Sequence, residues 1–166
     1  MKDRYKTLEL PSEGLYRAKG SKFIARAFPV ADEEEIKTYL DDLRKEYHDA
    51  RHHCYAWRLD PEGSLHRSND DGEPSGSAGK PILGQLRSFD VTQALVVVIR
   101  YFGGTLLGVG GLIQAYKGSH CRCPEKGCHR GTEGHVSTPC TLPLCPYKCR
   151  HATGSGTRAG NREPGI

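Results

Sequence analysis

The sequence predicts an α+β fold, a two-layer sandwich in which helices pack on one face of a mixed β-sheet. Segments with the two-residue period or the continuous apolar run of strands are interspersed with segments that have the period of helices. In chain order they read strand, strand, helix, strand, loop, helix, strand, helix. This order lacks the long strand–helix alternation that builds a parallel sheet. With 166 residues, the chain is long enough for one ordinary domain.

The first two strands are expected within residues 13–30. They are joined through Lys19-Gly20-Ser21, a composition typical of a tight turn. After the turn, Phe23, Ala25 and Ala27 alternate with their neighbours in an imperfect period of two. The pattern predicts two short strands connected by that turn.

The segment after Asp32 has the most regular pattern in the chain. Asp32 is a suitable N-cap, and Glu33–Glu35 occupy the first turn, where the helix dipole favours negative charge. Apolar residues then recur at the spacing of one helix face: Ile36, Tyr39, Leu40, Leu43 and Tyr47. The pattern predicts an amphipathic helix with one buried stripe.

Four further elements follow along the chain. Residues 52–59 are aromatic and alternating, which predicts a strand, and residues 68–79 have the composition of a loop. A helix begins at Lys80-Pro81, since proline is tolerated in a first helical turn. Residues 92–103 form a continuous apolar run, which is typical of a central strand. A last helix begins at Val109.

The composition changes sharply at residue 120. Residues 1–119 contain equal numbers of basic and acidic side chains, so residues 120–166 account for the whole formal net charge of +4. Six of the 7 cysteines also lie in residues 120–166, where large apolar residues are sparse. We expect residues 1–119 to form the folded domain, and residues 120–166 to be a disordered or out-of-frame tail rich in Cys, Gly and Arg.

Two interpretations of the tail compete. The codons of residues 120–127, read one base later, permit Thr-Ala-Asp-Ala-Leu-Lys-Lys, which would continue the preceding amphipathic helix. A frameshift or sequencing error at this point is therefore our preferred hypothesis. The rival is a zinc-binding tail, although the spacings around Cys121, Cys123, Cys128 and Cys140 fit no regular paired zinc site.

Composition also bears on the cellular environment and the partners. The chain has no secretory signal pattern at its N-terminus and no apolar run long enough to span a membrane. With one cysteine in residues 1–119, a cytoplasmic protein without a membrane partner is expected. The neutral charge of the same residues argues against strong nucleic-acid binding, which stays a weaker alternative.

The most polar motif is SNDDGEPSGSAGKP. Its carboxylates Asp70, Asp71 and Glu73 are consistent with a turn held by side-chain hydrogen bonds, or with a binding loop on a rigid scaffold. With His53 from the nearby strand they could also form a hydrolytic metal site. Neighbouring strand residues face opposite sides, so only one of the adjacent histidines could join it. No HExxH or paired CxxC supports a metal.

A glycine-rich segment, GGTLLGVGG, separates the apolar strand from the last helix. Its glycines could let backbone N–H groups approach an anion at a helix N-terminus, with Lys80, Arg100 and Lys117 supplying charge. They could equally allow the helix to pack closely on the sheet. The spacing matches neither GxGxxG nor a phosphate loop, so a binding domain is favoured over an enzyme.

Four blocks taken together resemble a known family. SKFIARAF, ARHHCYAW, NDDGEPSGSAGKPIL and VVVIRYFGGTLLGVGGLIQAY are similar to the YigZ/IMPACT family through its impact N-terminal domain. They cover most of residues 15–119 in the family's order. The resemblance implies a fold like the second domain of small-subunit ribosomal protein five. It also implies relatives that restrain translational stress signalling by binding the activator of a starvation kinase.

The resemblance further implies a binding surface made of the family's polar and glycine positions. These are His53, Asp70, Asp71, Glu73, Lys80, Arg100, Tyr101, Gly103, Gly104, Gly108, Gly110 and Gly111. We expect no catalytic residue, cofactor or metal among them, and a translation-associated protein or the ribosome as partner. The alternative is a metal- or phosphate-dependent hydrolase that uses His53, Asp70, Asp71 and Glu73. A proline-dipeptidase label carried by some relatives has no support in these residues.

Overall fold

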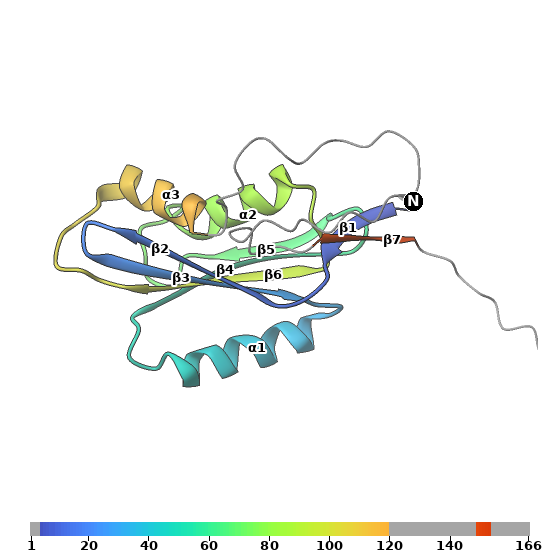
Figure 1. The fold of residues 1–166 in the computed structure, drawn as a ribbon, viewed down its shortest axis with the longest axis horizontal. Helices are drawn as coiled ribbons and strands as arrows, with labels where there is room; N and C mark the ends of the chain where they lie inside the picture. Colours follow the sequence, from blue (N-terminus) through green and yellow to red (C-terminus); the bar gives the residue numbers. More distant parts are fainter. Residues whose placement is uncertain (1–3, 120–148, 154–166) are drawn as a thin grey trace, which may run out of the picture.

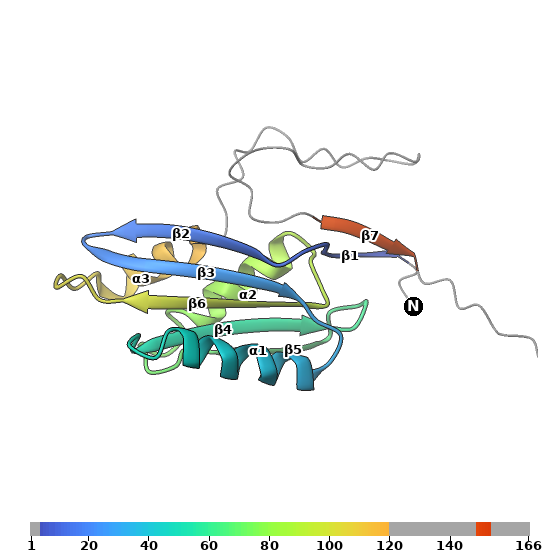
Figure 2. The ribbon, with the colours of Figure 1, turned by 60° about the horizontal axis from the view of Figure 1, so that its bottom comes forward.

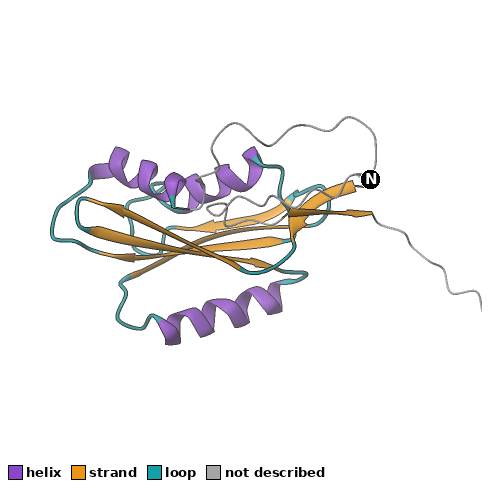
Figure 3. Ribbon diagram, viewed as in Figure 1, coloured by secondary structure: helices purple, strands orange, loops and turns teal. Residues whose placement is uncertain are grey.

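A computed structural model describes residues 4–119 and 149–153. Its main sheet has five strands in the order β2-β3-β6-β4-β5, with helices on both faces (Figures 1 and 3). The strands are β2 (Ser12–Ala18), β3 (Ser21–Pro29), β4 (His52–Leu59), β5 (Leu65–Asn69) and β6 (Ala94–Tyr101). The helices are α1 (Glu33–Glu46), α2 (Gly79–Ser88) and α3 (Gly108–Gly118). The α+β class predicted from the sequence is confirmed.

Two details of that prediction are wrong. The helices lie on both faces of the sheet, because α1 covers one face while α2 and α3 cover the other (Figure 1). All ladders of the five-stranded sheet are antiparallel, so the sheet is not mixed. None of the described helices is long and apolar enough to cross a membrane.

The central strand β6 explains why two helical layers are needed. Val96 and Val98 face the core under α2 and α3, whereas Val97 and Ile99 face the core under α1. All four side chains are fully buried. A strand buried on both faces reads as a continuous apolar run, and each face then requires its own cover.

The helix α1 begins as its sequence predicts. Asp32 accepts a hydrogen bond from the Glu35 N–H at 2.9 Å, and the Glu35 carboxylate accepts one from the Ala31 N–H at 2.8 Å. These reciprocal bonds satisfy N–H groups that have no partner within the helix. The apolar stripe through Ile36 and Leu43 then packs on the sheet.

Three described strands were not predicted. The strand β1 (Arg4–Leu8) pairs antiparallel with β7 (Cys149–Thr153), and β5 pairs with β4. The strand β5 is an edge strand with little apolar content, so it lacks the alternation that identifies a half-buried strand. The strand β7 falls within the predicted tail. The rest of that tail, residues 120–148 and 154–166, lies outside the described residues, so the prediction for it stays a prediction.

A glycine contact fixes one end of the sheet. The β2–β3 turn has positive φ at Lys19 and Gly20, 46° and 80°, as a tight two-residue hairpin turn requires. A Cβ on Gly103 would lie 1.9 Å from the carbonyl carbon of Gly20, so the two backbones touch. The Gly103 N–H also donates to the Ser21 hydroxyl at 3.2 Å. The β6–α3 loop is thereby tied to the hairpin.

We predict that Gly103→Ala destabilises the domain, because the added methyl group has no space against Gly20. The expected loss in the free energy of unfolding is about 1–3 kcal/mol, the usual cost of overpacking. Gly110→Ala is the matched control, since no atom lies within 4 Å of its Cβ position and alanine favours helix by roughly 0.5–1 kcal/mol. Urea unfolding of both variants provides the measurement, and equal stability of the two would contradict the contact.

Candidate functional site

Asp70 organises the polar loop between β5 and α2. Its carboxylate accepts hydrogen bonds from the backbone N–H groups of Gly76, Ala78 and Gly79, at 2.8, 3.0 and 2.8 Å. Partial burial raises the pKa of Asp70, but the three donors and nearby Lys80 more than offset this, and the pKa lies below its usual value. Asp70 therefore stays ionised and caps the start of α2.

Asp71 fastens the same loop to the start of β4. Its carboxylate accepts the His53 N–H at 2.7 Å, and its carbonyl oxygen lies 2.8 Å from Nδ1 of His52. The Asp71 N–H donates to the Asn69 side chain at 2.7 Å. With φ at 42°, Asp71 occupies a conformation that Asp and Asn tolerate better than most residues. The carboxylate thus ties the loop to the backbone of β4.

Glu73 points into the protein and forms a buried ion pair. Its Oε1 lies 2.5 Å from Nη1 of Arg100 on β6 and accepts a hydrogen bond from the Tyr116 hydroxyl on α3 at 2.9 Å. The side chains of Glu73 and Arg100 are only 3% and 7% exposed. The Cys54 thiol on β4 lies 3.3 Å from the Tyr116 hydroxyl and 2.9 Å from the Asp70 carbonyl oxygen. We call these four side chains, with Asp70, the buried network.

The chemistry of the buried network is structural. Burial raises the pKa values of the Cys54 thiol and the Tyr116 hydroxyl, so both remain protonated at neutral pH. A thiol in this state is a poor nucleophile. Both charges of the Glu73–Arg100 pair are neutralised within the protein. The network joins the loop, two strands and α3, and it presents no reactive group to solvent.

His53 and Tyr101 lie on the other side of the sheet. His53 is buried, with Nδ1 3.8 Å from the Asp71 carboxylate, and Nε2 has no hydrogen-bond partner among the described residues. Burial lowers the pKa of His53, an effect that Asp71 partly offsets. The Tyr101 hydroxyl donates to Asp49 at 2.7 Å, and this bond, with burial, raises the pKa of Tyr101 to about 12.

The predicted site residues therefore do not converge on one point. Asp70, Glu73 and Arg100 meet on the α2–α3 side, His53 and Tyr101 face the α1 side, and Lys80 is exposed. This follows from the strand geometry, because neighbouring residues such as Arg100 and Tyr101 face opposite sides. Among the residues that the structure describes, no three His, Cys, Asp or Glu side chains are placed to hold a metal ion. The geometry gives the hydrolase alternative no support.

The glycine segment exposes apolar side chains. Gly104 and Gly108 have positive φ, 86° and 70°, and lie in open space. Between and beside them, three large apolar side chains are exposed by 54%, 82% and 53%: Phe102, Leu106 and Val109. The sequence analysis missed these residues and Tyr116. The exposed apolar residues could have been identified from the sequence, because large apolar side chains within a glycine-rich turn are not needed for a core.

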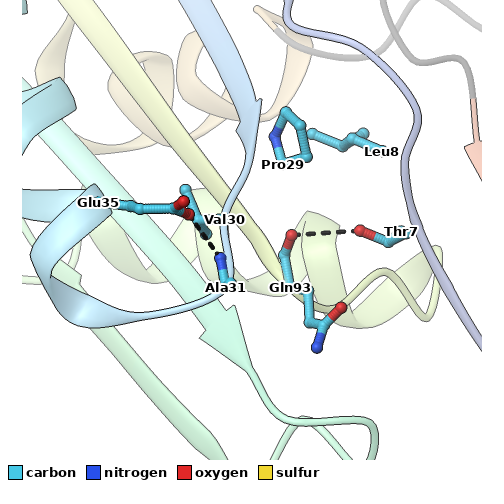
Figure 4. A pocket seen from close by; sticks show the side chains of 7 residues that line it. All are labelled: Thr7, Leu8, Pro29, Val30, Ala31, Glu35 and Gln93. Carbon is cyan, nitrogen blue, oxygen red and sulfur yellow. Dashed lines mark hydrogen bonds between the residues drawn. The ribbon is translucent and has the colours of Figure 1, made fainter. Parts of the chain in front are cut away.

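The opposite end of the sheet carries a shallow pocket of about 230 Å³ (Figure 4). Its lining consists of Thr7, Leu8, Pro29, Val30, Ala31, Glu35 and Gln93. The Thr7 hydroxyl donates to the Gln93 carbonyl at 3.2 Å, and the Glu35 carboxylate binds the Ala31 N–H. The Thr7 hydroxyl and the Glu35 carboxylate are thus bonded to main-chain groups of the lining, and the lining includes no residue of the polar loop.

Comparisons with known proteins agree on one family. The model of the Impact N-terminal domain matches residues 19–123. The IMPACT family member YigZ of Escherichia coli is 46% identical over 102 residues, which are 60% of this chain and 50% of that protein. The chain thus spans about half the length of this relative.

One solved structure supports the same fold. A crystal structure of a hypothetical protein is 40% identical, with a TM-score of 0.69, and the match covers 72% of this chain and 59% of that one. A structure described as the two-domain translational regulator Yih1 is 26% identical, covering 72% of this chain and 45% of that one. Its TM-score of 0.41 is too low to support an inference about this chain.

We predict that Glu73→Ala lowers the free energy of unfolding by about 3–5 kcal/mol, because it leaves the Arg100 guanidinium buried without its counter-charge. The double variant Glu73→Leu with Arg100→Met should recover much of this loss, since it removes both charges. Glu9→Ala, which removes an exposed carboxylate, is the control. Urea titration measures all three. A loss below about 1 kcal/mol for Glu73→Ala would contradict a stabilising role of this ion pair.

We also predict that stability falls as the pH drops below about 6.5, the usual histidine pKa in an unfolded chain. The pKa of His53 is lower in the folded protein. The unfolded state therefore binds the proton more readily, and the stability loss continues until the pH reaches the folded pKa. His53→Gln should flatten the plot of unfolding free energy against pH. His66→Gln, at an exposed position on β5, should retain the original slope; an unchanged slope in both variants would refute the prediction.

Proposed function

The chain belongs to the family of the Impact N-terminal domain, and from that premise we propose that it is a non-enzymatic regulatory protein that acts by binding. The partner is a translation-associated protein or the ribosome, in the cytoplasm. The binding surface is the outer side of the polar loop together with the β6–α3 glycine turn.

One observation carries the non-enzymatic part of the proposal. The three carboxylates that resemble catalytic groups are engaged within the protein: Asp70 by three backbone N–H donors, Asp71 by the His53 N–H, and Glu73 by the side chains of Arg100 and Tyr116. A reacting group needs access to a substrate. A loop held this rigidly on a scaffold is instead suited to present a fixed surface.

The translation part of the proposal depends on the family. The resemblance implies regulators that restrain stress signalling to an initiation factor by binding the activator of a starvation kinase. Because this chain spans about half the length of its bacterial relative, we propose only that its domain contributes a binding surface to regulation of this kind. The equal basic and acidic content of residues 1–119 favours a protein partner over nucleic acid.

We propose that residues 1–119 are the working domain, and that residues 120–166 are an appended, out-of-frame segment. The family model's match ends at residue 123, close to the change in composition, which supports this division. Independent sequencing of the encoding DNA around codon 120 tests it. A shifted frame that continues the last helix is the expected result, and an intact frame would overturn the proposal.

Site-specific photo-crosslinking tests the proposed surface. A crosslinking amino acid at the exposed positions Ser75, in the polar loop, and Thr105, in the glycine turn, should capture a translation-associated protein in a translating cell extract. The same amino acid at Leu65, exposed on β5, is the control. We expect a shared product at positions 75 and 105 that is absent at 65. Products equal at all three positions, or none, would contradict the proposal.

A further inference from the structure

One end of the molecule combines two segments that are far apart in sequence. The β2–β3 hairpin end, residues 17–22, lies beside the β6–α3 loop and the start of α3, residues 102–109, in both ribbon views (Figures 1 and 2). The backbone contact between Gly20 and Gly103 joins them. We call these two segments the tip.

The tip exposes apolar side chains on a fixed support. Phe102, Leu106 and Val109 are each more than half exposed. The Arg100 guanidinium, held by Glu73, lies 5.7 Å from the centroid of the Phe102 ring, a cation–π distance. Three large exposed apolar residues within residues 102–109 differ from the singly scattered ones of an ordinary surface, and such a group is typical of an interaction site.

The tip is also positively charged. Arg17 and Lys22 are paired directly across β2 and β3, and Lys19 lies on the turn between them. Like charges directly opposite one another destabilise a sheet. No acidic residue occurs in residues 14–31 or 91–119. Asp49 lies near this face, but it is a single carboxylate already bonded to Tyr101, so the hairpin end keeps an excess of positive charge.

We infer that the tip binds an acidic amphipathic segment of a partner protein, whose carboxylates meet Arg17, Lys19 and Lys22 and whose apolar side chains cover Leu106 and Val109. This inference rests on the proposed binding function and specifies the chemistry of the partner. Anionic side chains relieve the repulsion across the hairpin, and apolar side chains remove the exposed loop residues from water.

Two other anionic partners fit the tip less well. Single-stranded nucleic acid is bound through stacking on several aromatic side chains, whereas the exposed apolar residues of the tip are mostly aliphatic. Stable membrane binding needs a large amphipathic face or two anchoring signals, and three exposed side chains supply neither. Lys22 lies over the Tyr101 ring on the α1 side of the sheet, whereas Phe102 lies near Arg100 on the α2–α3 side. A protein segment that passes around the tip can contact the cations and the apolar residues together.

Titration with designed peptides, followed by backbone NMR of the full chain, tests the inference. The probes are an 18-residue helical peptide with a Leu face and a Glu face, the same peptide with Lys for Glu, and an acidic peptide with Ser for Leu. We expect the Leu/Glu peptide alone to shift the resonances of residues 17–22 and 102–109. Equal shifts with the Leu/Lys peptide, or none with the Leu/Glu peptide, would overturn the inference. Stronger shifts of the same residues with anionic vesicles or a single-stranded RNA would overturn it as well.

Variants separate this inference from the proposed function. The pairs Leu106→Ser with Val109→Ser, and Lys19→Glu with Lys22→Glu, should each weaken binding of the Leu/Glu peptide about tenfold or more. Leu65→Ser, at a leucine 49% exposed on β5, should leave it unchanged. If the unsubstituted chain forms the crosslink at position 75 but does not bind the Leu/Glu peptide, the tip inference fails and the proposed function stands. If the crosslink is absent but peptide binding depends on the tip residues, the proposed function fails and the tip inference stands.

Discussion

The ion pair between Glu73 and Arg100 is the constraint on which this domain depends. Two charges removed from water are tolerated only when each is neutralised and hydrogen-bonded. Glu73 can meet that condition only if the polar loop folds inward, β6 ends where Arg100 reaches it, and α3 places the Tyr116 hydroxyl 2.9 Å away. One interaction thus fixes the relative positions of a loop, a strand and a helix that are distant in sequence.

The loop around the ion pair follows from the same requirement. With Glu73 directed inward, the backbone between β5 and α2 must turn tightly, and its N–H groups need acceptors. Asp70 supplies three of these bonds and Asp71 supplies one to β4. The acidic residues that look like a metal or catalytic cluster are therefore the means by which a compact polar loop satisfies its own backbone. The outer surface of the loop is left to the small residues between them.

Local patterns predicted the elements that depend on local physics. The stripe from Ile36 to Tyr47 and the Asp32 cap identify α1, and the unbroken apolar run identifies β6. Both patterns involve residues that are close in sequence, so the sequence alone is enough to recognise them. The same run on β6 also implied cover on both faces, which the predicted two-layer sandwich overlooked. The roles of Glu73 and His53 could not be read locally, since Arg100 is 27 positions away and the direction of a side chain depends on strand register. The strands β1, β5 and β7 lack a clear apolar alternation, so their strand structure depends on pairing with segments that local sequence does not reveal.

These contacts separate the residues that hold the domain together from the residues that are available to bind a partner. The acidic residues of the loop and Arg100 are engaged in contacts that build the scaffold. Exposed side chains that the core does not need, such as those of Leu106 and Arg17, remain available to contact a partner. Because the ion pair and the contact of Gly103 with Gly20 hold the tip rigidly, little conformational entropy is lost when it binds, so a small surface can support useful affinity. Substitutions at a few exposed tip positions can thus change which partner is bound without changing the contacts that hold the domain together.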